Sequence, residues 1–228
     1  MKHIVYGLVW ILLSSACTPF KTHDKSSNQL VQLVVDDEDD LSADLLADIR
    51  KTSEGETNLY QWKNRLLFYG AKKEADRFYQ RCKTQFPKGT ITRTSTPFYA
   101  FDRARCADGE KMEQASDHIV LSANLVADSA MQKAYLSYHH RQFEEWPEVS
   151  EGFCRAEFQQ VLLYKIGRQL LLVIDIPKGA DFEALNKRTV ENNPRVDKWN
   201  HLMAAYQEGL PDTKAGEVWV RFEVMNVE

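Results

Sequence analysis

The 228-residue sequence predicts an α+β protein in which two tandem ferredoxin-like units form a pseudo-dimeric α/β barrel. Two observations predict it. Residues 29–101 and 118–224 each follow the order strand, helix, two strands, helix, strand. Each half also contains a similar hairpin, YQWKNRLLFY at 60–69 and YKIGRQLLLVI at 164–174. Two such units can pack sheet to sheet, as a homodimer of single units would. The alternative is that both hairpins are generic and the halves are unrelated.

In the first half, residues 29–35 (QLVQLVV) have β character, and residues 41–50 have apolar positions four apart, which is typical of a helix. Residues 57–69 predict a hairpin that turns at Lys63 and Asn64. Residues 71–86 are amphipathic and end before Pro87 and Gly89, so they predict a helix. Residues 91–101, rich in Thr and aromatics, predict the last strand of this half.

The second half predicts a strand over 118–125 and a helix over 129–153 that Pro147 interrupts. A hairpin over 158–176 turns at Ile166 and Gly167, and residues 180–205 are helical with a break at 192–194. Residues 217–224 are the last strand, in which Trp219 is expected to be structural. The resulting organisation is a signal at 1–17, a tether at 18–28, a non-catalytic unit at 29–103, a linker at 104–116 and a second unit at 117–228.

The N-terminus has the features of an export signal. A short polar start precedes the apolar residues 4–13, and three small residues lead directly into Cys17. The apolar run is too short for a spanning helix, which needs about 20 residues. Small residues before a cysteine resemble a lipoprotein box, so we expect a lipid on Cys17 and a flexible tether behind it. The expected location is the cell envelope, as a periplasmic or outer-membrane lipoprotein; the alternative is a plain signal cleaved nearby.

Composition limits the partners. The formal net charge is -4 and no dense Lys/Arg patch occurs, so nucleic acid is not an expected partner. Beyond Cys17, the sequence contains Cys82, Cys106 and Cys154, whose spacing does not suit zinc. An oxidising compartment permits one disulfide among them and leaves one free thiol, without indicating which two cysteines pair.

The side chains best suited to catalysis or ligand binding lie in two predicted helices of the second half. Tyr135 and His139 are four apart and therefore share one helix face. Trp199 lies on the later helix, on the same side of a ferredoxin-like sheet. An imidazole, a phenol and an indole could there meet a small polar ligand. Trp146, which precedes Pro147, is expected to be a packing residue at a helix kink.

Over residues 117–227 the sequence resembles the L-rhamnose mutarotase family. The shared order is Tyr135, His139, the Trp146-Pro147-Glu148 motif, an apolar hairpin and a helix that carries Trp199. Three features depart from the family pattern. Two extra residues separate His139 from Trp146, Asn200 replaces a second tryptophan, and Gln160-Val161 replaces a tyrosine early in the hairpin.

The resemblance implies that His139 is the catalytic proton donor, with Tyr135, Trp199 and Asn200 at the substrate. The implied reaction interconverts the α and β anomers of a rhamnose-like monosaccharide, and acid/base chemistry of this kind needs no metal or cofactor. The implied partners are a small sugar and, through the lipid, a membrane. The internal pseudo-dimer is compatible with a monomeric protein. The alternative function is a non-catalytic envelope lipoprotein that binds a ligand or partner protein through the same pocket.

Replacement of Cys17 tests the anchor. Lipidation requires the thiol, so Cys17→Ser should move the protein from the membrane fraction to the soluble fraction without unfolding it. Fractionation after a salt wash, followed by thermal denaturation, measures both effects. Cys17→Ser protein that stays in the washed membranes contradicts the lipid anchor.

Overall fold

The computed structural model describes residues 28–37, 41, 58–107 and 116–225. The signal, Cys17 and the tether up to residue 27 lie outside these residues, as do positions 42–50 of the first predicted helix and 108–115 of the predicted linker. Among the described residues, no helix is both long and apolar enough to cross a membrane.

The described residues of the first unit form the strands β1 (Asn28–Val34), β2 (Leu59–Trp62), β3 (Arg65–Ala71) and β4 (Thr90–Thr94). They lie in the order β4-β1-β3-β2, and neighbours are antiparallel. The predicted hairpin turn is confirmed, because Lys63 between β2 and β3 has a φ of 47°. This left-handed conformation is typical of tight hairpin turns.

The second unit repeats the same order with β6 (Ser116–Leu125), β7 (Gln160–Ile166), β8 (Gln169–Pro177) and β10 (Val220–Val224), arranged as β10-β6-β8-β7. Gly167, with a φ of 59°, forms the predicted turn between β7 and β8. The short strand β9 (Gln207–Glu208) pairs with the end of β6. The tandem ferredoxin-like arrangement predicted from the sequence is therefore confirmed.

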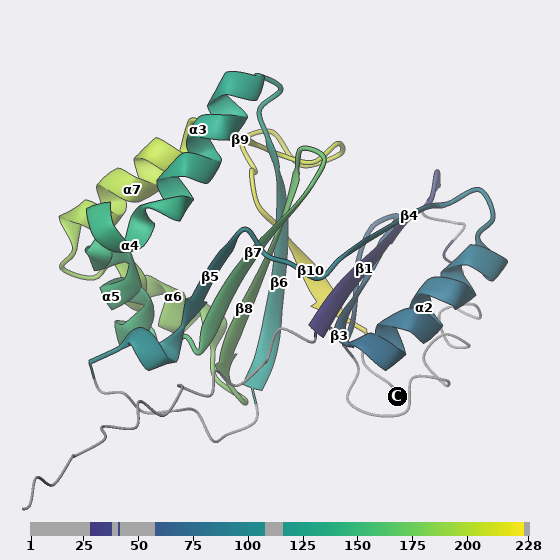
Figure 1. The fold of residues 1–228 in the computed structure, drawn as a ribbon, viewed down its shortest axis with the longest axis horizontal. Coiled ribbons are helices and arrows are strands. Elements are labelled where there is room, and N and C mark those ends of the chain that lie inside the picture. The colour runs from purple at the N-terminus through teal and green to yellow at the C-terminus, as the bar shows by residue number, and fades with distance from the viewer. Residues whose placement is uncertain (1–27, 38–40, 42–57, 108–115, 226–228) are drawn as a thin grey trace, which may run out of the picture.

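The helices lie on the two outer sides of the sheet (Figure 1). Helix α2 (Lys72–Gln85) covers the first unit. The second unit is covered by α3 (Ser129–His140), α4 (Gln142–Glu145), α5 (Pro147–Arg155), α6 (Phe182–Val190) and α7 (Pro194–Ala204).

Local sequence explains where these outer helices begin. The Asp128 and Asp181 carboxylates accept hydrogen bonds from backbone N–H groups in the first turns of α3 and α6. Helices α5 and α7 begin at Pro147 and Pro194, because proline fits the first turn, where its missing N–H costs nothing. The two breaks predicted from these prolines are confirmed.

The two sheets are joined by pairing and by a shared core. Strand β2 pairs with β10, so the units form one continuous sheet that curls on itself. Side chains from the inner faces of both units then pack together. This inner core includes Leu30, Tyr60, Leu67, Tyr69, Val120, Leu162, Tyr164, Leu171, Val173, Val220 and Phe222.

The strand predicted over 91–101 differs in the structure. It divides into β4 and a separate strand, β5 (Tyr99–Asp102), which pairs with β7 at the far edge of the second sheet. Pro97 lies between them and cannot donate a ladder hydrogen bond, which explains the break. The chain thus crosses to the second sheet before it reaches the predicted linker.

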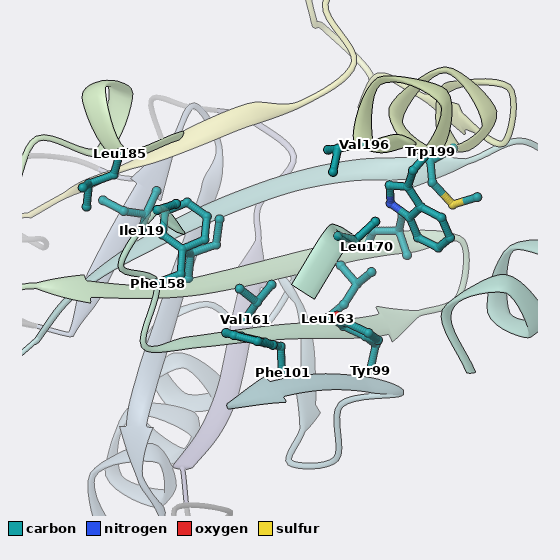
Figure 2. Close-up of a cluster of buried hydrophobic side chains, with 14 of the residues drawn as sticks. Tyr99, Phe101, Ile119, Phe158, Val161, Leu163, Leu170, Leu185, Val196 and Trp199 are labelled. Carbon is teal, nitrogen blue, oxygen red and sulfur yellow. The ribbon is translucent and has the colours of Figure 1, made fainter. Parts of the chain in front are cut away.

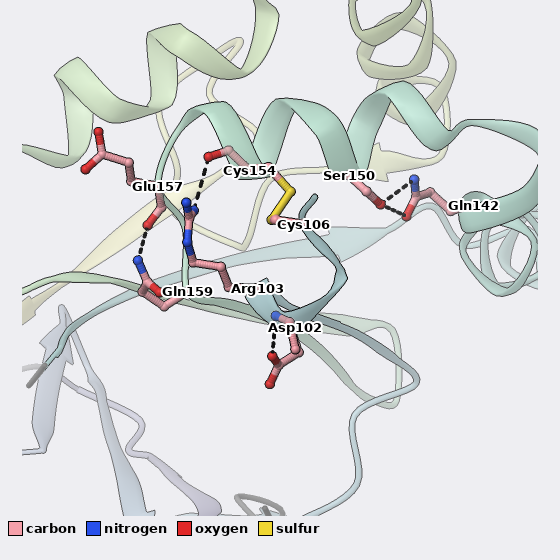
Figure 3. Close-up of a disulfide and its surroundings, with 9 residues drawn as sticks. Asp102, Arg103, Cys106, Gln142, Ser150, Cys154, Glu157 and Gln159 are labelled. Carbon is pink, nitrogen blue, oxygen red and sulfur yellow. Dashed lines mark hydrogen bonds between the residues drawn. A yellow bond between two sulfur atoms is a disulfide. The ribbon is translucent and has the colours of Figure 1, made fainter. Parts of the chain in front are cut away.

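The cysteine pairing is resolved among Cys82, Cys106 and Cys154. A disulfide joins Cys106 to Cys154, across 48 residues of sequence (Figure 3). Cys82 is a buried free thiol. Burial raises the pKa of the Cys82 thiol to about 12, so it remains protonated. One disulfide and one free thiol are what the sequence predicted.

Removal of the first half tests the shared core. A fragment of residues 117–228 exposes the inner sheet face of the second unit, including Val120, Val173 and Phe222. An apolar face of this kind should drive self-association or aggregation, because it seeks a partner surface. Light scattering after size exclusion measures this. A soluble, monomeric fragment that melts at the temperature of the full chain contradicts the shared core.

Candidate active site

Helix α3 directs the two predicted residues inward. Tyr135 and His139 are the buried residues of α3, with 1% and 7% of their surfaces exposed. His140 is exposed, because one residue along a helix turns a side chain by about 100°. The four-residue spacing therefore brings the phenol and the imidazole to the same side of the helix.

A cavity of about 710 Å³ lies between the outer face of the second sheet and helices α3, α5, α6 and α7. All four predicted ligand-contacting residues, Tyr135, His139, Trp199 and Asn200, line it. Most of the remaining wall is apolar, with Leu121, Leu163, Leu172 and Ile174 contributed by the sheet. Small-molecule sites commonly have volumes of roughly 300–1,000 Å³ and mostly apolar walls with a few polar groups. Figure 2 shows Trp199 of α7 above the strands that form part of this wall.

The tautomer of His139 follows from one hydrogen bond. Its Nδ1 lies 3.0 Å from the backbone carbonyl oxygen of Tyr135. A carbonyl only accepts, so Nδ1 carries the proton and donates it. The neutral ring then has its lone pair on Nε2. This nitrogen can accept a proton from a ligand.

Aromatic rings enclose the imidazole. The ring centroid of His139 lies 4.3 Å from that of Tyr135, 5.1 Å from that of Trp199, 5.4 Å from that of Tyr99 and 5.8 Å from that of Phe98. Such surroundings disfavour a charge. Burial lowers the pKa of His139 from 6.5 to about 4, although the hydrogen bond to the Tyr135 carbonyl acts in the opposite direction. The imidazole is therefore neutral at neutral pH.

Tyr135 is held by a chain of polar side chains. The Nε2 of Gln207, on β9, donates to the Tyr135 hydroxyl oxygen at 3.0 Å. The Nε1 of Trp219 in turn donates to Oε1 of Gln207 at 3.1 Å. Burial raises the pKa of the Tyr135 phenol, which keeps it protonated. Because Gln207 donates to this phenol, the Tyr135 hydroxyl proton can be directed to a ligand.

Sequence reasoning missed several residues of this site. Tyr99, Gln207 and Trp219 line the cavity, and Gln142, also in its wall, accepts a 2.7 Å hydrogen bond from the Tyr99 hydroxyl. Trp219 was expected to be only structural, yet it borders the cavity and holds Gln207. The two glutamines carried no sequence signal, because their importance arises from contacts between distant segments.

The remaining predicted positions fit the geometry. The Trp146 ring packs 5.6 Å from that of Trp199 and beneath the guanidinium of Arg195, as expected of a packing residue at a kink. Asn200 and Val161, at two of the departures from the family pattern, both line the cavity. Among the described residues, no cluster of three or more His, Cys, Asp or Glu side chains could hold a metal ion.

Fold and cavity together define the class: a tandem ferredoxin-like α/β barrel whose second unit holds a buried histidine in an aromatic-walled cavity. Residues 119–226 match the model of the L-rhamnose mutarotase family, which confirms the resemblance for the second unit. An L-fucose mutarotase of Xanthomonas campestris pv. campestris is 29% identical over 93 residues, which cover 40% of this chain and 73% of that protein. A UPF0734 protein of Dictyostelium discoideum is 24% identical over 99 residues, covering 42% and 77% respectively. The second unit is thus a mutarotase-like domain.

The buried imidazole predicts how stability depends on pH. In the folded state the pKa of His139 is about 4, and in the unfolded chain it returns to about 6.5. Above pH 6.5 neither state binds the proton, so the stabilisation is fully present. As pH falls towards 4, only the unfolded state takes up the proton, and stability should fall by up to roughly 3 kcal/mol.

Urea denaturation at several pH values between 7 and 4 measures this effect. His139→Gln should lose this part of the pH dependence, whereas the exposed neighbour variant His140→Gln should keep it. The difference between variants matters, because carboxylates titrate in the same range. Identical slopes for wild type and His139→Gln contradict the burial of a neutral imidazole.

Proposed function

We propose that the second unit interconverts the α and β anomers of a monosaccharide, with His139 as the acid/base group. The observation that carries this proposal is the neutral imidazole in the cavity, whose Nδ1 proton is committed to the Tyr135 carbonyl. Its Nε2 is therefore a base at neutral pH. The resemblance to the L-rhamnose mutarotases supports the same role.

The lowered pKa determines the order of proton transfers. His139 is uncharged at neutral pH and must accept a proton before it can donate one. In the proposed first step, Nε2 removes the proton of the anomeric hydroxyl, while the Tyr135 hydroxyl gives its proton to the ring oxygen. The bond between C1 and the ring oxygen breaks, and the open-chain aldehyde forms.

Ring closure reverses these transfers. After rotation about the C1–C2 bond, the released hydroxyl attacks the other face of the aldehyde and returns its proton to Tyr135. The imidazolium of His139 protonates the new anomeric oxygen, so both groups regain their starting states. The charges on imidazolium and phenolate compensate each other in the intermediate, which lowers the cost of charge in this buried site.

The cavity wall favours a sugar with an apolar edge. Trp199 and Tyr135 offer aromatic faces to the C–H faces of a pyranose, and the aliphatic sheet residues can receive a methyl group. L-rhamnose and L-fucose, the sugars in the names of the matched family and relative, are both 6-deoxyhexoses with a C5 methyl substituent. We therefore propose a rhamnose-like deoxyhexose as the substrate class.

We also propose that the domain works in the cell envelope, anchored through a lipid on Cys17. Two features support this. The N-terminus has the composition of a lipoprotein signal, and the Cys106–Cys154 disulfide is of a type that persists in oxidising compartments. The mutarotase-like domain would then meet its sugar outside the cytoplasm.

Anomer exchange measured by NMR tests the activity. Saturation transfer between the α and β anomeric signals of L-rhamnose should be faster with the protein than without it. His139→Gln keeps a hydrogen-bonding side chain of similar size but cannot titrate near neutral pH. It should lower the exchange rate by roughly 10²–10⁴-fold, the usual effect of losing a general acid or base. The acid limb of the pH profile should lie near pH 4, because the wild-type imidazole is protonated only there.

His140→Gln serves as the matched control and should leave exchange unchanged, because His140 faces solvent. Equal exchange by wild type and His139→Gln removes His139 from the mechanism. Sugar binding without exchange in the wild type instead favours the alternative, a non-catalytic envelope protein that uses the same cavity for a ligand.

A further inference from the structure

The strand β5 lies outside the segment that matches the mutarotase family, yet it reaches the site. It pairs with β7 so that Tyr99 lies opposite Leu163 and Phe101 opposite Val161. Alternation along the strand turns Tyr99 and Phe101 towards the helices of the second unit, where both are buried, while Ala100 is exposed on the other side. Figure 2 shows Tyr99 and Phe101 on β5 beside β7.

Phe98, which precedes β5, and Tyr99, its first residue, both contact the ring of His139, the proposed catalytic group. The rings of Phe98 and Tyr99 meet His139 edge to face, at interplanar angles of 76° and 81°. They form the side of the imidazole enclosure that α3 and α7 do not supply. Phe101, two residues along the same face, packs instead against Phe153, with centroids 5.2 Å apart.

A hydrogen bond ties Tyr99 to the helices. Its hydroxyl donates to Oε1 of Gln142, a fully buried residue. The Nε2 of Gln142 donates to the Trp146 carbonyl oxygen at 2.6 Å, and Trp146 packs on Trp199. The position of β5 is thereby coupled to the opposite aromatic wall of the cavity.

The end of β5 is fixed covalently. Beyond the strand, Cys106 forms the disulfide with Cys154 of α5, and the Arg103 guanidinium donates to the Cys154 carbonyl oxygen at 3.1 Å (Figure 3). The backbone N–H groups of Phe98 and Arg103 add hydrogen bonds to Leu163 and Gln159. The segment is therefore held at both ends against the second unit.

We propose that β5 is a positioning element of the site, in which Tyr99, with Phe98, keeps water away from the His139 imidazole and fixes its orientation towards the cavity. The proposal rests on the proposed function for the role of His139, but the contact can be tested without sugar turnover. Strand β5 and the preceding Phe98, which lie outside the segment that matches the family, would thus form part of the site.

Burial is the main influence on the pKa of His139, because the groups that contact its ring carry no charge. Tyr135 of α3 and Tyr99 of β5 are buried phenols that are uncharged in the protein without sugar, since burial raises the pKa of each. On α7 the contact is Trp199, which does not titrate. The charged side chains that line the cavity, Glu183 and Lys187 of α6, are exposed.

Titration of His139 by NMR in the full-length protein tests the proposal. The histidine signals are assigned by comparison with His139→Gln. Tyr99→Ala should admit water beside the imidazole and raise the pKa of His139 by about one unit or more. Phe101→Ala is the matched control, because it removes a buried ring from the same strand and face without touching His139. Phe101→Ala should leave the pKa of His139 unchanged.

An unchanged pKa in Tyr99→Ala, or an equal rise in both variants, overturns the proposal. If the alanine variants do not fold, Tyr99→Leu and Phe101→Leu replace them, and a smaller rise confined to Tyr99→Leu is expected. Where the wild type exchanges anomers, the acid limb of the pH profile should move with the pKa. A shifted pKa in a protein that exchanges no sugar refutes the proposed function and supports the positioning role.

Discussion

The inner faces of the two units are mostly apolar and cover each other. Tyr60, Leu67 and Tyr69 of the first unit pack against residues such as Val173 and Phe222 of the second, while the helices cover only the outer faces. Burial of apolar surface is the main source of folding free energy, so this arrangement makes the units mutually dependent. It also leaves the outer side of the second sheet free to form a cavity beneath its helices.

A second constraint acts at the cavity, where the buried imidazole of His139 has to be uncharged. An aromatic enclosure stabilises the neutral form of His139 and makes its protonation costly. This cost lowers the stability of the folded state at acidic pH, and the imidazole stays neutral, with a free lone pair on Nε2, over a wide pH range. Proteins commonly place groups with altered proton affinity at functional sites for this reason.

Sequence reasoning succeeded where the signal is local. The hairpin turns at Lys63 and Gly167 and the helix starts at Pro147 and Pro194 follow from the backbone preferences of those residues. The pairing of Tyr135 with His139 follows from helical spacing alone. These elements could therefore be located without any knowledge of long-range contacts.

What could not be predicted depends on contacts between distant segments. Residues 91–101 were predicted as one strand, and neither its division near Pro97 nor the sheet that receives β5 followed from the sequence. The roles of Tyr99 and Gln207 depend on the neighbours that the fold gives them. The cysteine pair was open for the same reason, since the spacing of Cys106 and Cys154 in the sequence does not reveal their proximity in space.

The disulfide has a consequence for how the chain responds to proteolysis. Cys106 precedes the segment that leads into β6, and Cys154 lies in α5, so the bond spans the junction between the two units. A protease that cuts once between these cysteines leaves two pieces that stay covalently joined until a reductant separates them. A single cut between the two cysteines therefore does not release the two units from each other.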